Sequence, residues 1–174
     1  MSVKHGLLAL LCEGPRYGYE LKSAFEARTG ATWPLNVGQV YTTLGRLERD
    51  GLVALDGEDA EGHALYRVTA TGTREVEDWW GQAVEREAPP RDELAIKLAL
   101  AIGLPGVDAR DVLQRQRTAT IRALQAHTRK KSALPAGDTA ATLVLDALVF
   151  AAEAEVRWLD HCEARLSRVR NGAR

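Results

Sequence analysis

NVGQVYTTLGRLERDGLV, residues 36–53, and ALYRV, residues 64–68, are the stretches that decide the fold of this chain. Asn36 and Gln39 have the spacing of a capping box, in which the first side chain caps a helix and the second reaches back to it. Gly51 stands where a helix often ends in a left-handed residue, and an apolar, β-compatible run starts at Leu52. The pattern therefore predicts a capped helix that starts at Asn36 and is followed by a β-hairpin.

The predicted helix has one apolar and one polar face. The apolar positions recur at helical spacing and are Val37, Val40, Leu44 and Leu47. The opposite face carries Gln39, Thr42, Thr43, Arg46 and Arg49. Such side chains can donate to phosphates, and Gln and Arg suit the base edges of adenine and guanine. Any amphipathic helix has a polar face, so the neighbouring sequence has to indicate whether this face binds a partner.

The upstream sequence supplies that context. A short apolar helix over residues 3–11 is broken at Gly14-Pro15, and a second helix opens at Tyr17 with Phe25 on its apolar side. A loop through Trp33 then leads to Asn36. Helix, turn, helix, loop, capped helix and two-stranded wing is the element order of a winged helix-turn-helix.

Three motifs resemble those of the PadR-like transcriptional regulators: YGYEL at 17–21, G-x-x-Y-x-x-L-x-x-L-x-x-x-G-L over 38–52, and YRVT-x-x-G over 66–72. The resemblance implies an N-terminal DNA-binding unit, a C-terminal helical arm that dimerises, and repression more often than activation. Together with the polar helix face, it predicts these DNA-binding residues: Asn36, Gly38, Gln39, Tyr41, Thr42, Thr43, Arg46, Lys22, Tyr19 and Arg67. A pseudo-palindromic double-stranded operator is the expected partner, because a dimer reads paired half-sites.

The charge of the chain gives only modest support for nucleic acid. The formal net charge is −1, and residues 1–49 hold six Lys or Arg against four Glu. The expected wing tip at residues 56–62 is acidic and would be repelled by phosphates, although His63 and Arg67 remain candidate backbone contacts. An interaction module that binds protein rather than DNA is the alternative function.

The chain is about a hundred residues longer than one winged helix, which allows a second small helical domain. Thr69 is expected to cap a helix from about 70 towards 86, with Val76, Trp79 or Trp80, Ala83 and Val84 available for packing. Pro89-Pro90 ends it. This predicts a winged helix-turn-helix domain over 1–88 and a helical dimerisation domain over 89–174, so the fold class is mostly α with a small β-wing.

The second domain reads as three helices: 93–102, 108–131 and a long one from 138 or 139 to about 170. Eight residues of the last helix are spaced alternately three and four positions apart, and seven of them are small or apolar. They are Leu145, Leu148, Ala152, Glu155, Leu159, Cys162, Leu166 and Val169. This is the spacing of a coiled-coil seam. The expected partner is the same helix of a second copy, with Glu155 as the polar interruption. Packing within one subunit is the alternative.

Other functions find little support in the sequence. No phosphate loop, Gly-x-Ser-x-Gly elbow or His-Glu-x-x-His pair occurs, so neither an enzyme nor a cofactor is expected. Asp160-His161-Cys162-Glu163 lies on successive helical positions, which point in different directions, so no metal site is expected. No apolar run could span a membrane, and two isolated cysteines suit the cytoplasm. Trp79 and Trp80 are candidates for an effector pocket, if they are not simply part of the core.

Overall fold

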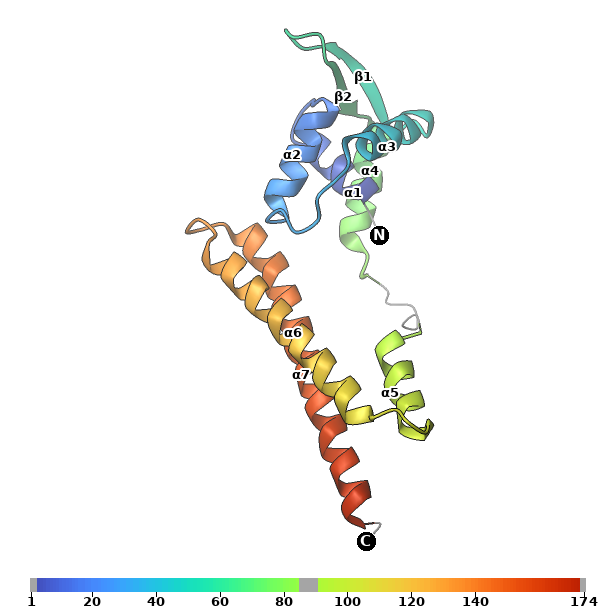
Figure 1. Ribbon diagram of the computed structural model, residues 1–174. Coiled ribbons are helices and arrows are strands. Elements are labelled where there is room, and N and C mark those ends of the chain that lie inside the picture. Colours follow the sequence, from blue (N-terminus) through green and yellow to red (C-terminus); the bar gives the residue numbers. More distant parts are fainter. Residues whose placement is uncertain (1–2, 85–90, 173–174) are drawn as a thin grey trace. The chain divides into compact units, whose positions relative to one another are not determined.

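The computed structural model describes residues 3–84 and 91–172. The chain divides into two compact units, Met1–Glu85 and Arg86–Arg174, each of which is described by itself (Figure 1). The predicted boundary between residues 88 and 89, with the Pro89-Pro90 break, lies outside the described residues. The mostly helical fold class with a two-stranded wing is confirmed.

The first unit is built from four helices and one hairpin. In chain order these are α1 Val3–Leu11, α2 Gly18–Arg28, α3 Val37–Arg49, β1 Val53–Glu58, β2 Ala64–Val68 and α4 Ala70–Gly81. Apolar faces of α1, α2 and α3 meet in one core, whose fully buried side chains include Leu8, Leu21 and Leu44. Val40 and Leu47 are buried in the same core. The predicted apolar side of α3 is correct there, but Val37 is 42% exposed because it lies in the first turn, beyond the edge of the core.

Local sequence signals set both ends of α3. The Asn36 carboxamide accepts a hydrogen bond from the amide of Gly38 at 2.8 Å, which caps the first turn. At the other end Gly51 has φ +71°, and its amide donates to the carbonyl of Glu48. The next amide, that of Leu52, donates to the carbonyl of Leu47, which completes a Schellman motif. The predicted start and stop of this helix are therefore confirmed.

The wing is tied to the loop before α2. β1 and β2 pair antiparallel, with Val53 opposite Val68 and Leu55 opposite Tyr66. Arg16 forms an isolated bridge with Tyr66, each backbone amide donating to the other carbonyl at 3.0–3.1 Å. The hairpin is thus anchored at the N-terminal end of α2 as well as at its own base.

Thr69 caps α4, as predicted, by accepting a hydrogen bond from the amide of Gly72. The helix ends at Gly81, earlier than the predicted end near residue 86. Ala83 and Val84 lie outside the helix and are exposed, so their predicted packing role is wrong. The glycine lowers helix propensity at this point.

The second unit comprises α5 Glu93–Gly103, α6 Ala109–Ser132 and α7 Thr139–Gly172. Asp92 and Asp108 cap α5 and α6 through their carboxylates. α6 and α7 form a long antiparallel hairpin (Figure 1). Its interface combines an apolar cluster around Leu113 and Leu159 with ion pairs such as that between Lys131 and Asp146.

The seam of α7 is filled by α6 of the same chain, which corrects the predicted interface. Leu145 and Leu159 are fully buried, Cys162 and Leu166 pack on the apolar cluster, and Leu148 and Ala152 are half-buried. Glu155 accepts hydrogen bonds from Thr120 Oγ1 at 2.5 Å and Gln116 Nε2 at 2.9 Å. The short connection over residues 133–138 folds α6 back onto this face, so the alternative packing within one subunit is the one observed.

Within the described ranges, no helix is both long enough and apolar enough to cross a membrane.

Candidate nucleic-acid interface

The solvent-facing side of α3 is the candidate interface. Of the residues predicted to contact DNA, the exposed ones on or beside this helix are Asn36, Gly38, Gln39, Tyr41, Thr42 and Arg46. Thr43 is half-buried. One face of α3 is therefore held in the core by Val40, Leu44 and Leu47, while the polar groups are presented together.

Tyr41 is positioned by a glycine of the neighbouring helix. A Cβ atom added at Gly18, the first residue of α2, would lie 2.6 Å from Cζ of the Tyr41 ring. Only glycine allows this approach without a shift of the ring. The sequence motifs contain both residues, and their contact gives a physical reason for the pair. Tyr41 is thereby fixed at the junction of α2 and α3, with its ring partly open to solvent.

The threonine hydroxyls of α3 are turned towards their own helix. Thr42 Oγ1 donates to the carbonyl of Gly38 at 2.8 Å, and Thr43 Oγ1 donates to that of Gln39 at 2.8 Å. These side chains were predicted as donors to DNA. Each hydroxyl has a single proton, so in this conformation neither donates outward.

The cations of the interface differ in how far they are neutralised. Lys22 forms an ion pair with Glu26 at 2.8 Å, and Arg67 forms one with Asp56 at 3.1 Å. The hydrogen bond from Lys22 lowers the pKa of the Glu26 carboxyl below its ordinary value, helped by a bond from the Leu35 amide. No ion pair involves Arg46 in the part of the chain that the structure describes. Among the cations predicted to bind DNA, Arg46 is therefore the one without a competing carboxylate.

Lys22 also lies over the ring of Tyr19, 5.8 Å from its centroid, and Tyr19 is itself exposed. These two predicted residues thus occur together on α2, apart from the face of α3.

Hydrogen bonds to Asp59 stabilise the tip of the wing. Asp59 accepts hydrogen bonds from the amides of Glu61 and His63 and from the His63 ring at 2.7–3.0 Å. The same ring stacks on Tyr17 with centroids 4.6 Å apart. Asp59, Glu61 and His63 could together offer three ligand atoms within 4.8 Å, a grouping the sequence analysis did not predict. Both Asp59 oxygens are engaged in these bonds, so the cluster stabilises the turn of the wing.

Lys4 is a residue that the sequence analysis missed. It lies in the first turn of α1 and lines a hollow of about 340 Å³ together with Gln39, Thr43 and Arg46. Its ammonium group pairs with Glu75 of α4 at 2.7 Å. Nothing in the sequence places the start of α1 beside α3, since this proximity comes from tertiary packing.

Trp79 and Trp80 do line a cavity, as the effector hypothesis requires. It measures about 340 Å³ and lies between α1, α2 and α4, with Phe25 and Val76 among its apolar walls. Arg28 lines it too and forms an ion pair with Glu13 at 2.6 Å. Trp79 also stacks on His5, so it serves the packing of α4 on α1 as well.

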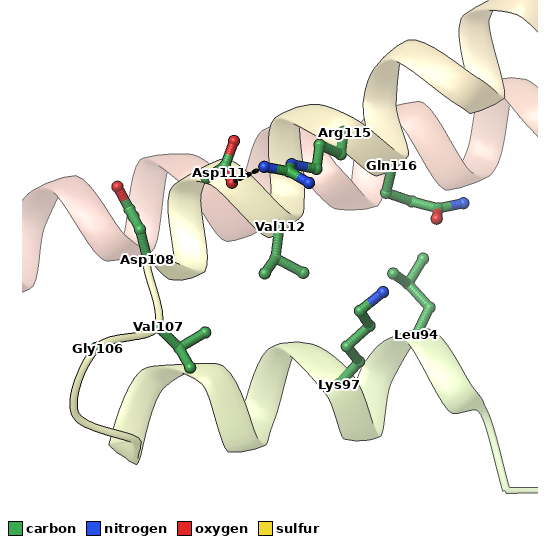
Figure 2. A pocket seen from close by; sticks show the side chains of 9 residues that line it. All are labelled: Leu94, Lys97, Gly106, Val107, Asp108, Asp111, Val112, Arg115 and Gln116. Carbon is green, nitrogen blue, oxygen red and sulfur yellow. Dashed lines mark ion pairs between the residues drawn. The ribbon is translucent and has the colours of Figure 1, made fainter.

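A further hollow, of about 400 Å³, lies between α5 and α6 (Figure 2). Leu94, Val107 and Val112 face it, and the Lys97 side chain extends into the gap (Figure 2). Arg115 on its rim is paired with Asp111 at 2.7 Å. Unlike the tryptophan-lined cavity, it has no aromatic wall.

Each of the two units matches a known protein family. Residues 7–78 match the Transcriptional regulator PadR-like family, and residues 90–167 match Virulence activator alpha C-term. The chain is 27% identical over 189 residues to the probable transcriptional regulator Rv1176c of Mycobacterium tuberculosis, covering 98% of this chain and all of that protein. It is 26% identical over 118 residues to the negative transcriptional regulator PadR of Bacillus subtilis, covering 66% of this chain and 64% of that protein.

Solved structures share the fold. PadR of Bacillus subtilis in complex with operator DNA superposes with a TM-score of 0.70 at 23% identity, over 94% of this chain and 97% of that one. The same protein in complex with p-coumaric acid gives 0.73 at 23% identity, over 95% and 98%. The winged helix and the helical arm thus occur together in these structures, in the order seen here.

Proposed function

The chain belongs to the PadR-like family of transcriptional regulators, and we propose that it is a homodimeric, sequence-specific DNA-binding repressor. Its activity is binding without catalysis, on chromosomal DNA in the cytoplasm. Repression is supported by the relative described as a negative transcriptional regulator. The expected operator is a pseudo-palindrome, because a two-fold dimer presents two copies of α3.

The observation that carries this proposal is the exposed face of α3. Its cap, its C-terminal turn and its buried side fix the helix rigidly, while Gln39, Tyr41 and Arg46 stay accessible. A helix held in this way can enter a major groove, and the PadR structure with operator DNA has the same fold.

The acidic wing tip favours one other function, that of a protein-interaction module. A gel-shift titration with the DNA upstream of the protein's own gene separates the two. A specific shift that resists competitor DNA supports the regulator, whereas no shift at low salt supports the module.

We expect Arg46→Ala to weaken binding to the cognate operator by about 1 to 3 kcal/mol and to relax the preference at one position. Arg46 has no competing carboxylate, so its guanidinium can reach a base edge. Lys22→Ala should instead weaken cognate and scrambled DNA alike, because a phosphate contact carries no sequence information. Binding titrations of both variants on both DNAs measure this. If neither variant changes the cognate affinity, the face has been assigned wrongly.

The homodimer needs an interface, and the outward side of α7 is the candidate for it. Leu143 and Phe150 are 65% and 64% exposed, and Trp158 is 36% exposed. Their spacings of seven and eight place them on one side of α7, outside the seam that α6 fills. An exposed apolar row of this kind marks an interaction site, and we propose that a second copy covers it.

The cavity lined by Trp79 and Trp80 is the proposed effector site. Its walls suit a flat apolar molecule, and Arg28 could bind a carboxylate in place of Glu13. The PadR complex with p-coumaric acid makes a small aromatic acid a reasonable first ligand to test.

We expect p-coumaric acid to change the tryptophan fluorescence of the wild type and to release DNA. Trp79→Phe and Trp80→Phe should each reduce the fluorescence change, because these rings would contact the ligand. Trp33→Phe is the matched control, since Trp33 does not line the cavity. An acid that releases DNA with the same fluorescence response in all variants would place the effector site elsewhere.

A further inference from the structure

Thr42 is an exposed side chain of α3 whose hydroxyl is already engaged. Its Oγ1 donates to the carbonyl of Gly38 at 2.8 Å. A hydroxyl has one proton, so this bond removes Thr42 as a donor to a base or a phosphate. The group that remains free on its Cβ atom is the methyl group.

Two of the four neighbours of Thr42 along the helix surface are glycines, and the other two are Gln39 and Arg46. Gly38 precedes it by four positions and Gly45 follows it by three, and these are the spacings at which helical side chains are adjacent. A Cβ atom added at Gly45 would meet nothing within 4 Å, so no internal contact requires a glycine there. Glycine is also among the poorest residues for a helix interior. The absence of side chains at positions 38 and 45 leaves a path, between Gln39 and Arg46, along which another molecule can approach this short side chain closely.

The major groove contains a matching apolar group. Thymine presents a C5-methyl group there, and apolar contact with a threonine methyl is one of the ways in which proteins recognise it. A polar side chain with a free donor would instead favour the hydrogen-bonding atoms of the other bases.

We propose that Thr42 recognises a thymine in each operator half-site through contact between its methyl group and the thymine methyl. Gly38 and Gly45 allow α3 to approach the major groove closely at this point. This inference rests on the proposed DNA-binding function. Thr43 is a weaker candidate, although its hydroxyl is engaged in the same way, because its side chain is half-buried beside Lys4.

The test starts from the operator. Full-length protein selects its binding site from a random duplex library, and each thymine of the selected half-site is then replaced by deoxyuridine, which removes only the methyl group. We expect one position per half-site at which the wild type binds about fourfold more weakly, the effect of one buried methyl-sized group.

Two substitutions at Thr42 separate the methyl group from the hydroxyl. Thr42→Ser keeps the hydroxyl and loses the methyl, so it should bind the thymine operator about fourfold more weakly and no longer distinguish deoxyuridine. Thr42→Val keeps a methyl group in a similar shape, so it should retain both the affinity and the discrimination. Circular dichroism confirms that both variants are folded.

Gly45→Ala tests the close approach independently. The added methyl group should reduce both affinity and deoxyuridine discrimination while the helix itself becomes more stable. The proposal is overturned if Thr42→Ser keeps the wild-type preference for thymine, or if Thr42→Val loses as much as Thr42→Ser. If the wild type selects no sequence at all, the DNA-binding function fails first, and the two failures are thereby distinguished.

Discussion

Phe150→Glu is expected to convert the dimer into a monomer and to lower affinity for a two-half-site operator by about 100-fold or more. Phe150 is 64% exposed in the single chain and lies on the outward face of α7 between Leu143 and Trp158. A two-fold interface places the same surface patch on both subunits, so every substitution enters it twice. Charged side chains buried there without partners would strongly disfavour association. The loss of affinity follows because two linked half-site contacts become independent.

Light scattering gives the mass, and a titration on one and two half-sites gives the loss of linkage. Phe150→Leu is the matched control, since it keeps an apolar side chain and should remain dimeric. Leu159→Ala, on the inner face of α7, should instead destabilise the arm by about 2 to 5 kcal/mol through a core cavity. An intact Phe150→Glu dimer would point to the exposed apolar side chains of α5, Ile96 and Leu100.

The inner and outer faces of α7 show where sequence reasoning stops. The three-and-four spacing correctly identified an apolar face around Leu145 and Leu159, because that periodicity follows from helix geometry alone. It could not say which helix fills the face. That choice depends on α6 folding back through a short turn and on hydrogen bonds to Glu155 from residues 35 and 39 positions away.

Features fixed by neighbouring residues were predicted well. The cap at Asn36, the left-handed Gly51 and the cap at Thr69 each depend on groups within a few positions. The polar face of α3 was predicted for the same reason. What the sequence could not give was the state of each polar group, such as the pairing of Arg67 with Asp56 across the wing. The contact set of Lys4 was missed because it joins α1 to α3 and α4.

Gly72 is a motif residue whose role only the structure explains. It lies in the first turn of α4, where a Cβ atom would stand 2.1 Å from the carbonyl oxygen of Leu52 and 2.8 Å from Cγ2 of Val68. That carbonyl cannot easily move, because it accepts a hydrogen bond from the amide of Thr69 at 3.0 Å. The Thr69 hydroxyl also donates to the neighbouring carbonyl, that of Gly51, at 2.7 Å. The start of α4 is therefore packed directly on the backbone that leads from α3 into the wing.

We expect Gly72→Ala to lower the free energy of unfolding of the winged-helix unit by about 3 kcal/mol, since an extra methyl group must separate two backbone segments that hydrogen bonds hold together. Gly45→Ala is the matched control: it is also a helical glycine, but its added methyl group meets open space, so the same change should stabilise the unit by about 1 kcal/mol. Urea unfolding followed by tryptophan fluorescence measures both, because Trp79 and Trp80 belong to this unit. Opposite signs would show that the approach of α4 to Leu52, rather than helix propensity, requires glycine at position 72. A Gly72→Ala variant as stable as the wild type would mean that α4 can shift away from the wing at little cost, and the rigid placement of α3 would then need another explanation.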